Sequence, residues 1–254
     1  MPRFFKLTVA YDGTNYSGWQ VQPEQRTIQG ELQSAIRRAT KHEVAVIGSG
    51  RTDAGVHAIG QVASIKLPEW TAGTIALTKA INSRLPETIS VLRVDEAPDD
   101  FHAIRDAIGK RYRYQLQVRG NHCPFEHRYR WRLRRAVDID AMQQAAERIV
   151  GEKDFASFQS AGADRKTTVR DVRACDVIVQ NADPERFHVA IEVESNGFLY
   201  NMVRNIVGTV VEVGFGKQPP EWIDEVISAQ NRIHAGQTAP PQGLFLLRVD
   251  YDPM

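Results

Sequence analysis

The chain lacks the features that mark secreted, membrane or cysteine-rich proteins. It has only two cysteines in 254 residues, Cys123 and Cys175, and they form no CxxC pair. That is too few for a disulfide framework, so we expect a reducing compartment. The N-terminus carries charges where a secretory leader would be apolar. The most apolar stretch, 205–215, is too short to cross a bilayer and contains Glu212. These absences predict a cytoplasmic protein without membrane association.

Net charge is also nearly absent, because 32 Lys and Arg face 31 Asp and Glu, giving a formal charge of +1. The distribution of charge is uneven, however. Residues 105–135 contain ten Lys or Arg and two acids, a local charge of +8, so the rest of the chain sums to −7. A basic segment in a neutral chain is typical of a polyanion binder, although a set of solvated strand faces explains it equally well.

Hydrophobic periodicity predicts the same order of elements in both halves, namely strand, helix, strand, strand, helix, strand. In the first half we expect strands over 4–12, 43–47, 60–67 and 89–94, and helices over 28–39, capped by Thr27, and 71–83. In the second half we expect strands over 110–118, 169–180, 186–195 and 244–251, and helices over 138–150 and 199–215. A basic extended piece, 128–135, and a short helix, 221–229, are inserted.

Two β-α-β-β-α-β units predict an α+β fold with two ferredoxin-like, RRM-like halves. Each half is expected to be part of a largely antiparallel sheet with helices on one face. The other face would be free to receive nucleotides, and a central RNA-binding cleft is expected. The strongly basic segment begins within 98–107, so we place the domain boundary there, with an N-terminal domain at 1–104 and a C-terminal domain at 105–254.

Glycines flank a charged tripeptide in 48–58, GSGRTDAGVHA. The segment is not a dinucleotide fingerprint, because Asp53 stands where that motif needs glycine. It is not a P-loop either, because no Lys-Ser/Thr pair follows the last glycine. The glycines instead predict a tight turn that displays Arg51 and Asp53. An aspartate there can be a nucleophile, a general base or a metal ligand, or it can simply cap a turn; with His57 alone it offers too few ligands for a metal.

Two further features could take part in chemistry. Arg204 lies inside the last long apolar helix, where a guanidinium must reach water or pair with an anion. Pairing with a carboxylate would keep a catalytic aspartate ionised and oriented. Tyr112 and Tyr114 alternate with Arg111 and Arg113, which places the two residue types on opposite faces of a strand. Such tyrosines can stack on a nucleobase or fill the core.

In order along the chain, these segments resemble the tRNA pseudouridine synthase A family. The similarity runs from about residue 4 to residue 251 without a missing block. The matching stretches are Tyr11–Thr14, Gly18–Gln20, Gly50–Ala58, Lys110–Tyr114, Asp154–Phe158 and Met202–Gly208. The resemblance implies an isomerase without cofactor or metal that converts uridine to pseudouridine at positions 38, 39 and 40, in the anticodon stem-loop of tRNA. It also implies a homodimer.

The same resemblance implies roles for individual residues. Asp53 would be the nucleophile acting on a flipped-out nucleotide, with Arg204 as its ion-pair partner. Tyr112 would lie against the target base, and Arg51 beside the flipped nucleotide. The basic residues of the Tyr112 strand are expected to contact the RNA backbone: Lys110, Arg111 and Arg113.

Several alternatives stay open at this point. A carboxylate nucleophile could add to C6 of the uracil, attack C1′ of the ribose or remove the proton from C2′. A non-catalytic RNA-binding module with two RRM-like halves is the alternative function, although an RNP1-type strand is not found. A hydrolase that uses Asp53 with His57 is the third.

Overall fold

The computed structural model describes residues 3–162, 167–182 and 187–252, which form two compact units of mixed α/β structure. The first unit comprises the chain up to Ile108 together with the segment from Phe245, and the second comprises Gly109–Leu244. This differs from the expected division into 1–104 and 105–254. The closing strand β10 (Leu244–Tyr251) contributes to the first unit, because it pairs in parallel with β3 (His57–Leu67), where Phe245 lies opposite His57.

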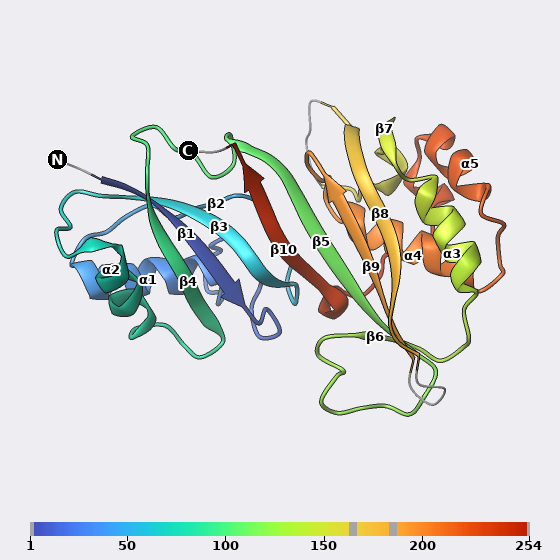
Figure 1. Cartoon of the computed structure of the whole chain (residues 1–254), viewed down its shortest axis with the longest axis horizontal. Coiled ribbons are helices and arrows are strands. Elements are labelled where there is room, and N and C mark those ends of the chain that lie inside the picture. The colour runs from blue at the N-terminus through green and yellow to red at the C-terminus, as the bar shows by residue number, and fades with distance from the viewer. Residues whose placement is uncertain (1–2, 163–166, 183–186, 253–254) are drawn as a thin grey trace. The chain divides into compact units, whose positions relative to one another are not determined.

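The first unit contains the elements that periodicity predicts (Figure 1). They are β1 (Arg3–Tyr11), α1 (Ile28–Thr40), β2 (Ile47–Gly48), β3, α2 (Gly73–Asn82), β4 (Ile89–Ala97) and β10. The strand order is β4-β1-β3-β10, with β2 also paired to β3, and β1 is antiparallel to both of its neighbours. The strand expected over 43–47 is reduced to two paired residues, because 42–46 form an irregular segment.

Alternation in β1 determines which side of this sheet is the core. Side chains at 5, 7, 9 and 11 are buried, and those between them are less so, as predicted. Helix α1 contributes apolar residues at helical spacing, and α2 contacts β4. The core residues on these elements are Phe5, Leu7, Val9, Ile28, Leu32, Ile36, Leu77 and Ile81.

The opposite face of this sheet is not free, which corrects the expectation of an open RRM-like face. Phe101 and Ala103, from the segment after β4, pack on Val62 of β3, with Tyr251 beside them. The Tyr251 hydroxyl donates a hydrogen bond to the carbonyl of Ala103 at 2.7 Å. Residues near the end of β4 and the start of β5 therefore cover part of the surface that a nucleotide would need.

The second unit contains the two longest of the described strands and three of the described α-helices. Its elements are β5 (Ala107–Val118, beginning at the unit boundary), β6 (Trp131–Leu133), α3 (Ile139–Glu147), β7 (Gly151–Asp154), η1 (Ala156–Phe158), β8 (Val169–Ala182), β9 (Phe187–Ser195), α4 (Met202–Gly214), α5 (Trp222–Ala229), η2 (Arg232–His234) and η3 (Pro241–Gly243). The strands follow the order β5-β9-β8-β7 with antiparallel pairing, and β6 pairs in parallel with β5.

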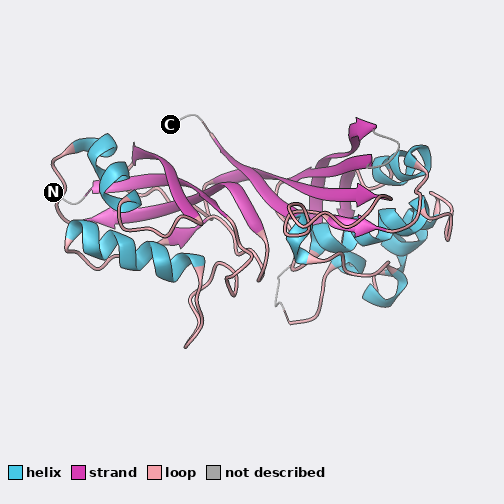
Figure 2. Cartoon of the chain, turned by 90° about the horizontal axis from the view of Figure 1, so that it is seen from below, coloured by secondary structure: helices cyan, strands magenta, loops and turns pink. Residues whose placement is uncertain are grey.

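Helix α4 is almost entirely buried, in agreement with its apolar sequence. It packs beside α3, which in turn contacts β8 (Figure 1). Figure 2 shows helices, in cyan, packed against strands, in magenta. Gly208 allows α4 to approach the segment after η2, because a Cβ there would lie 1.7 Å from the carbonyl oxygen of Gln237. None of the described helices combines the length and apolarity needed for a membrane span.

The Thr27 cap of α1 can be tested directly. Its side chain accepts a hydrogen bond from the Gly30 amide at 3.3 Å. We expect Thr27→Ala to lower the free energy of unfolding by about 1 kcal/mol, because an amide of the first turn loses its partner. Urea unfolding of the variant, with Thr27→Ser as the control that keeps the hydroxyl, measures this. Equal midpoints for the Ala and wild-type proteins would contradict the assignment.

Candidate active site

Asp53 lies in a tight turn just before β3. Its carbonyl oxygen accepts a hydrogen bond from the Val56 amide at 3.1 Å. Gly55, between them, has a φ of +77°, a conformation that favours glycine. Arg51 is exposed, and Asp53 is half-buried. The prediction of a tight turn that displays Arg51 and Asp53 is therefore confirmed.

Two other glycines allow the segment after β1 to pack against the Asp53 turn. A Cβ on Gly13 would lie 2.0 Å from the Val56 carbonyl oxygen, and one on Gly18 would lie 2.6 Å from that of Thr52. The Trp19 amide donates to the same Thr52 oxygen at 3.0 Å. The 11–14 and 18–20 segments thus pack closely against the turn and support it.

A fully buried glutamine, Gln61 of β3, holds the start of the turn. Its Oε1 accepts hydrogen bonds from the Ser49 hydroxyl at 2.6 Å and the Val62 amide at 3.1 Å. Its Nε2 donates to the Gly50 carbonyl at 2.9 Å and to the Tyr11 hydroxyl at 3.5 Å. The amide thereby uses both acceptor lone pairs and both N–H groups, so it is fully satisfied without water.

Tyr11 extends this buried network to the other side of Arg51. Its hydroxyl lies 2.8 Å from Oγ1 of Thr52, and both side chains are buried. Burial raises the pKa of Tyr11 to about 12, although the hydrogen bonds with Thr52 and Gln61 act in the opposite direction. The residues before and after Arg51 are thus each fixed by a buried polar side chain.

His57 has a structural environment. Its side chain is only 1% exposed, and its ring stacks on Phe245 with the centroids 4.6 Å apart. Nδ1 accepts a hydrogen bond from the Gly13 amide at 3.1 Å, although it lies equally close to Asp12 Oδ1. This environment does not favour the hydrolase interpretation, which needs an accessible His57.

In the second unit, Arg204 near the start of α4 is held by neighbouring groups. Its Nε donates to the Ala239 carbonyl at 2.7 Å, and Nη1 donates to Oδ1 of Asn201 at 2.9 Å. The Ala239 amide donates back to the Arg204 carbonyl at 3.1 Å. Asn201, the N-cap, has a φ of +60°. The guanidinium is therefore half-buried and oriented, in contrast to a side chain that snorkels to water.

A buried amide next to Arg204 links α4 to two distant segments. Nδ2 of Asn205 donates to the Phe158 carbonyl at 2.8 Å, and its Oδ1 accepts from Arg232 at 3.0 Å and Thr238 at 2.7 Å. This explains why the 154–158 stretch belongs with the 202–208 stretch. Sequence reasoning missed both Asn205 and Gln61; the available signal was a lone amide inside an apolar pattern.

The tyrosines of β5 share one face of the strand, as predicted. Tyr114 is fully buried, and its hydroxyl donates to the Pro240 carbonyl at 2.7 Å, so it is a core residue. Burial raises its pKa well above the ordinary value. Tyr112 is 8% exposed and packs edge-on against Phe198, with the ring centroids 5.1 Å apart.

Arg111 and Arg113, on the other face of β5, are engaged in ion pairs. Arg111 contacts Glu192 at 2.6 Å, Glu194 at 3.1 Å and Asp176 at 3.2 Å, and Arg113 contacts Glu192 at 2.5 Å. Burial alone would raise the pKa of Glu192, but the two guanidinium groups outweigh it and lower that pKa. Two cations against three carboxylates leave this cluster without surplus positive charge for RNA. Lys110, the third expected backbone contact, is half-buried.

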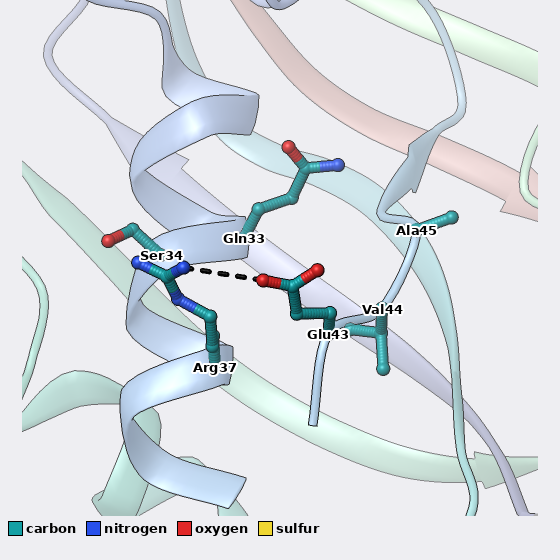
Figure 3. A pocket seen from close by; sticks show the side chains of 6 residues that line it. All are labelled: Gln33, Ser34, Arg37, Glu43, Val44 and Ala45. Carbon is teal, nitrogen blue, oxygen red and sulfur yellow. Dashed lines mark hydrogen bonds and ion pairs between the residues drawn. The ribbon is translucent and has the colours of Figure 1, made fainter. Parts of the chain in front are cut away.

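One hollow on the first unit is a poor candidate for the site. The hollow lies beside α1 and is lined by Gln33, Ser34, Arg37, Glu43, Val44 and Ala45, and an ion pair of 3.3 Å joins Arg37 to Glu43 across it (Figure 3). None of the predicted site residues lines it. Within the described ranges, no group of three His, Cys, Asp or Glu side chains could hold a metal ion.

The buried Tyr11 hydroxyl gives a testable pH dependence. The folded pKa, about 12, lies above the ordinary 10.0. The stability contributed by the neutral phenol is therefore complete below pH 10 and is lost as the pH rises through 12. Between pH 9 and 11.5 we expect wild type to lose about 2 kcal/mol more unfolding free energy than Tyr11→Phe. Urea unfolding at both pH values measures this, and equal losses in the two proteins would contradict it.

Comparison with known proteins places these features in one family. Residues 7–105 and 145–252 match the family model described as tRNA pseudouridine synthase. The tRNA pseudouridine synthase A of Brevibacillus brevis is 45% identical, over 97% of this chain and 98% of that protein. The tRNA pseudouridine synthase A of Caldicellulosiruptor bescii is 44% identical, over 96% of this chain and 98% of that protein. The tRNA pseudouridine synthase A of Myxococcus xanthus is 42% identical, over 99% of this chain and 92% of that protein. The resemblance read from the motifs is confirmed, and the chain belongs to the tRNA pseudouridine synthase A family.

Proposed function

We propose that Asp53 is the nucleophile with which this tRNA pseudouridine synthase converts uridine to pseudouridine, at positions 38, 39 and 40 of the anticodon stem-loop. The observation that supports this most directly is the construction of the Asp53 turn. Buried groups hold Gly50 and Thr52 in place, while the aspartate itself is only half-buried. A nucleophile that must meet a flipped-out nucleotide needs this combination of fixed backbone and access.

The reaction fits the residues that the chain offers. The N-glycosidic bond breaks, the uracil turns and a C–C bond forms at C5. The C5 proton leaves to water and N1 takes up a proton from water, so atoms balance and no electrons are gained or lost overall. A carboxylate can begin this by adding to C6, attacking C1′ or removing the C2′ proton. Flipping the nucleotide costs a few kcal/mol, which contacts to the RNA backbone can offset.

The other roles follow the family resemblance. Arg204 is the proposed ion-pair partner of Asp53, and its support is a guanidinium already oriented by Ala239 and Asn201. Arg51 is proposed to lie beside the flipped nucleotide, supported by its exposure next to Asp53. Tyr112 is proposed to lie against the target base. Backbone contact by the basic residues of β5 has weaker support, because Arg111 and Arg113 already pair with carboxylates.

Expectations about fold, oligomeric state and location also belong with this proposal. The succession β1-α1-β2-β3-α2-β4 in the first unit supports a ferredoxin-like half, and we propose a second such half and a central RNA-binding cleft. We propose a homodimer without cofactor or metal, on the family resemblance alone. A cytoplasmic location is supported by two cysteines that are both free.

The alternative, a binding module that receives RNA on its sheet faces, fits the structure less well. In the first unit, Phe101 and Ala103 cover part of the face that lies away from the core. In the second unit, the face with Arg111 and Arg113 also carries three carboxylates that neutralise them. Within the described residues, neither face offers the open, positively charged platform with aromatic side chains that such a module needs.

Replacing Asp53 tests the proposed nucleophile. We expect Asp53→Asn to lower release of tritium from tRNA labelled at uracil C5 by more than about 1000-fold, because the amide cannot attack or accept the proton. The Kd for tRNA should stay within about threefold of wild type, since the turn keeps its supports. Asp140→Asn, an exposed carboxylate on α3, is the control and should turn over normally. Wild-type rates in a clean Asp53→Asn preparation would refute the role.

The Gln61 network yields a second kinetic prediction. Gln61→Leu removes the bonds to Gly50 and Tyr11, so we expect kcat to fall about 10- to 100-fold with little change in tRNA affinity. Asn82→Leu is a matched control, because that amide holds the amide and carbonyl of Val91 at 2.8 Å each, on β4. Both variants should lose stability, but only Gln61→Leu should lose kcat per folded molecule. Equal kcat losses in the two would mean that Gln61 has only a structural role.

A further inference from the structure

Three exposed arginines lie at one end of the β5–β6 pair: Arg119, Arg134 and Arg135. The two strands run in parallel, with Val118 opposite Leu133, and the Arg119 amide donates to the Leu133 carbonyl at 2.8 Å. The next residue of each strand is an arginine. Arg119 and Arg134 therefore follow the last paired residues of the two strands, and Arg135 comes next.

This arrangement opposes the stability of the fold. Like charges on neighbouring strands repel each other. Arg119 also has a φ of +60°, in the left-handed region that non-glycine residues rarely adopt. Among the described residues, none of the three arginines forms an ion pair with a carboxylate, in contrast to Arg111 and Arg113 of β5. Within the part of the chain that the structure describes, these three charges are therefore not neutralised by a carboxylate, which suits an anionic partner.

The backbone under these arginines is held firmly. Nε2 of Gln117 donates to the carbonyls of Arg119 at 3.1 Å and Asn121 at 2.9 Å. Nε of Arg132 donates to the Gly120 carbonyl at 3.0 Å, which fixes the tip of the turn. The guanidinium of Arg135 lies over the Phe215 ring, 5.2 Å from its centroid. The charges are thus presented from a preorganised support, which reduces the entropy lost on binding.

We propose that Arg119, Arg134 and Arg135 form a contact surface for the phosphate backbone of the tRNA substrate. This rests on the proposed function, in which tRNA is the substrate. Closely spaced guanidinium groups suit a polymer whose phosphates are also closely spaced, and phosphate contacts position an RNA without reading its sequence. The surface differs from the β5 residues first expected to contact the backbone, whose charges are used within the chain.

The test is a triple variant, Arg119→Gln, Arg134→Gln and Arg135→Gln, assayed for tRNA binding at several salt concentrations. We expect the Kd to rise about 10- to 30-fold near 100 mM salt, and the slope of log Kd against log salt to fall by about 2 to 3. The kcat at saturating tRNA should be unchanged, because the surface contacts no reacting atom. Replacing the three arginines by lysine should restore most of the affinity, since the charge is kept.

The matched control removes the same charge elsewhere, by Arg37→Gln, Arg38→Gln and Arg84→Gln, all exposed on the first unit. It should bind tRNA nearly as wild type does. Equal weakening in both triple variants, or an unchanged salt slope in the first, would overturn the proposal. Urea midpoints check folding, and the first variant should be at least as stable as wild type because repulsion is relieved. Tritium release by wild type in the same reactions tests the proposed function separately, so the two failures are distinguishable.

Discussion

The hydrogen bonds of the buried Gln61 amide are the constraint on which the Asp53 turn most depends. The Gln61 side chain, on β3, forms hydrogen bonds with Ser49, the Gly50 carbonyl and Tyr11. The Tyr11 hydroxyl in turn forms a hydrogen bond with Thr52. A buried amide is costly unless every polar atom has a partner. Its complete satisfaction fixes one arrangement of the loop, because any shift of Gly50 or Thr52 would leave a buried group unpaired.

The second unit applies the same principle to a cation. Arg204 is oriented by one backbone carbonyl and one side-chain amide, and the adjacent Asn205 anchors its helix to η1 and to the segment after η2. Gly208 makes this approach possible, since a side chain there would clash with Gln237. In both units, a charged side chain of the proposed mechanism (the nucleophile Asp53 in the first, its ion-pair partner Arg204 in the second) is supported by buried polar groups that have hydrogen-bond partners. Loss of those buried hydrogen bonds would let Asp53 or Arg204 move from its position, although the side chain itself would still be present.

Local patterns in the sequence predicted most of the elements, because alternation in β1 and helical spacing in α1 and α4 depend on near neighbours alone. The family motifs also identified the Asp53 turn. Contacts between distant residues could not be read in this way. The carboxylates that neutralise Arg111 lie on β8 and β9, at least 65 residues away in the chain. The position of β10 and the covering of one sheet face by Phe101 likewise depend on pairings that no local pattern specifies.

The most direct test of the account is to locate pseudouridine in unmodified tRNA after incubation with the purified protein. The reaction is run with a chelator and without added cofactor, in parallel with the Asp53→Asn protein. The account predicts pseudouridine at positions 38, 39 or 40 with the wild-type chain and none with the variant. Pseudouridine formed by the variant at the wild-type rate, or formed only outside the anticodon stem-loop, would contradict it.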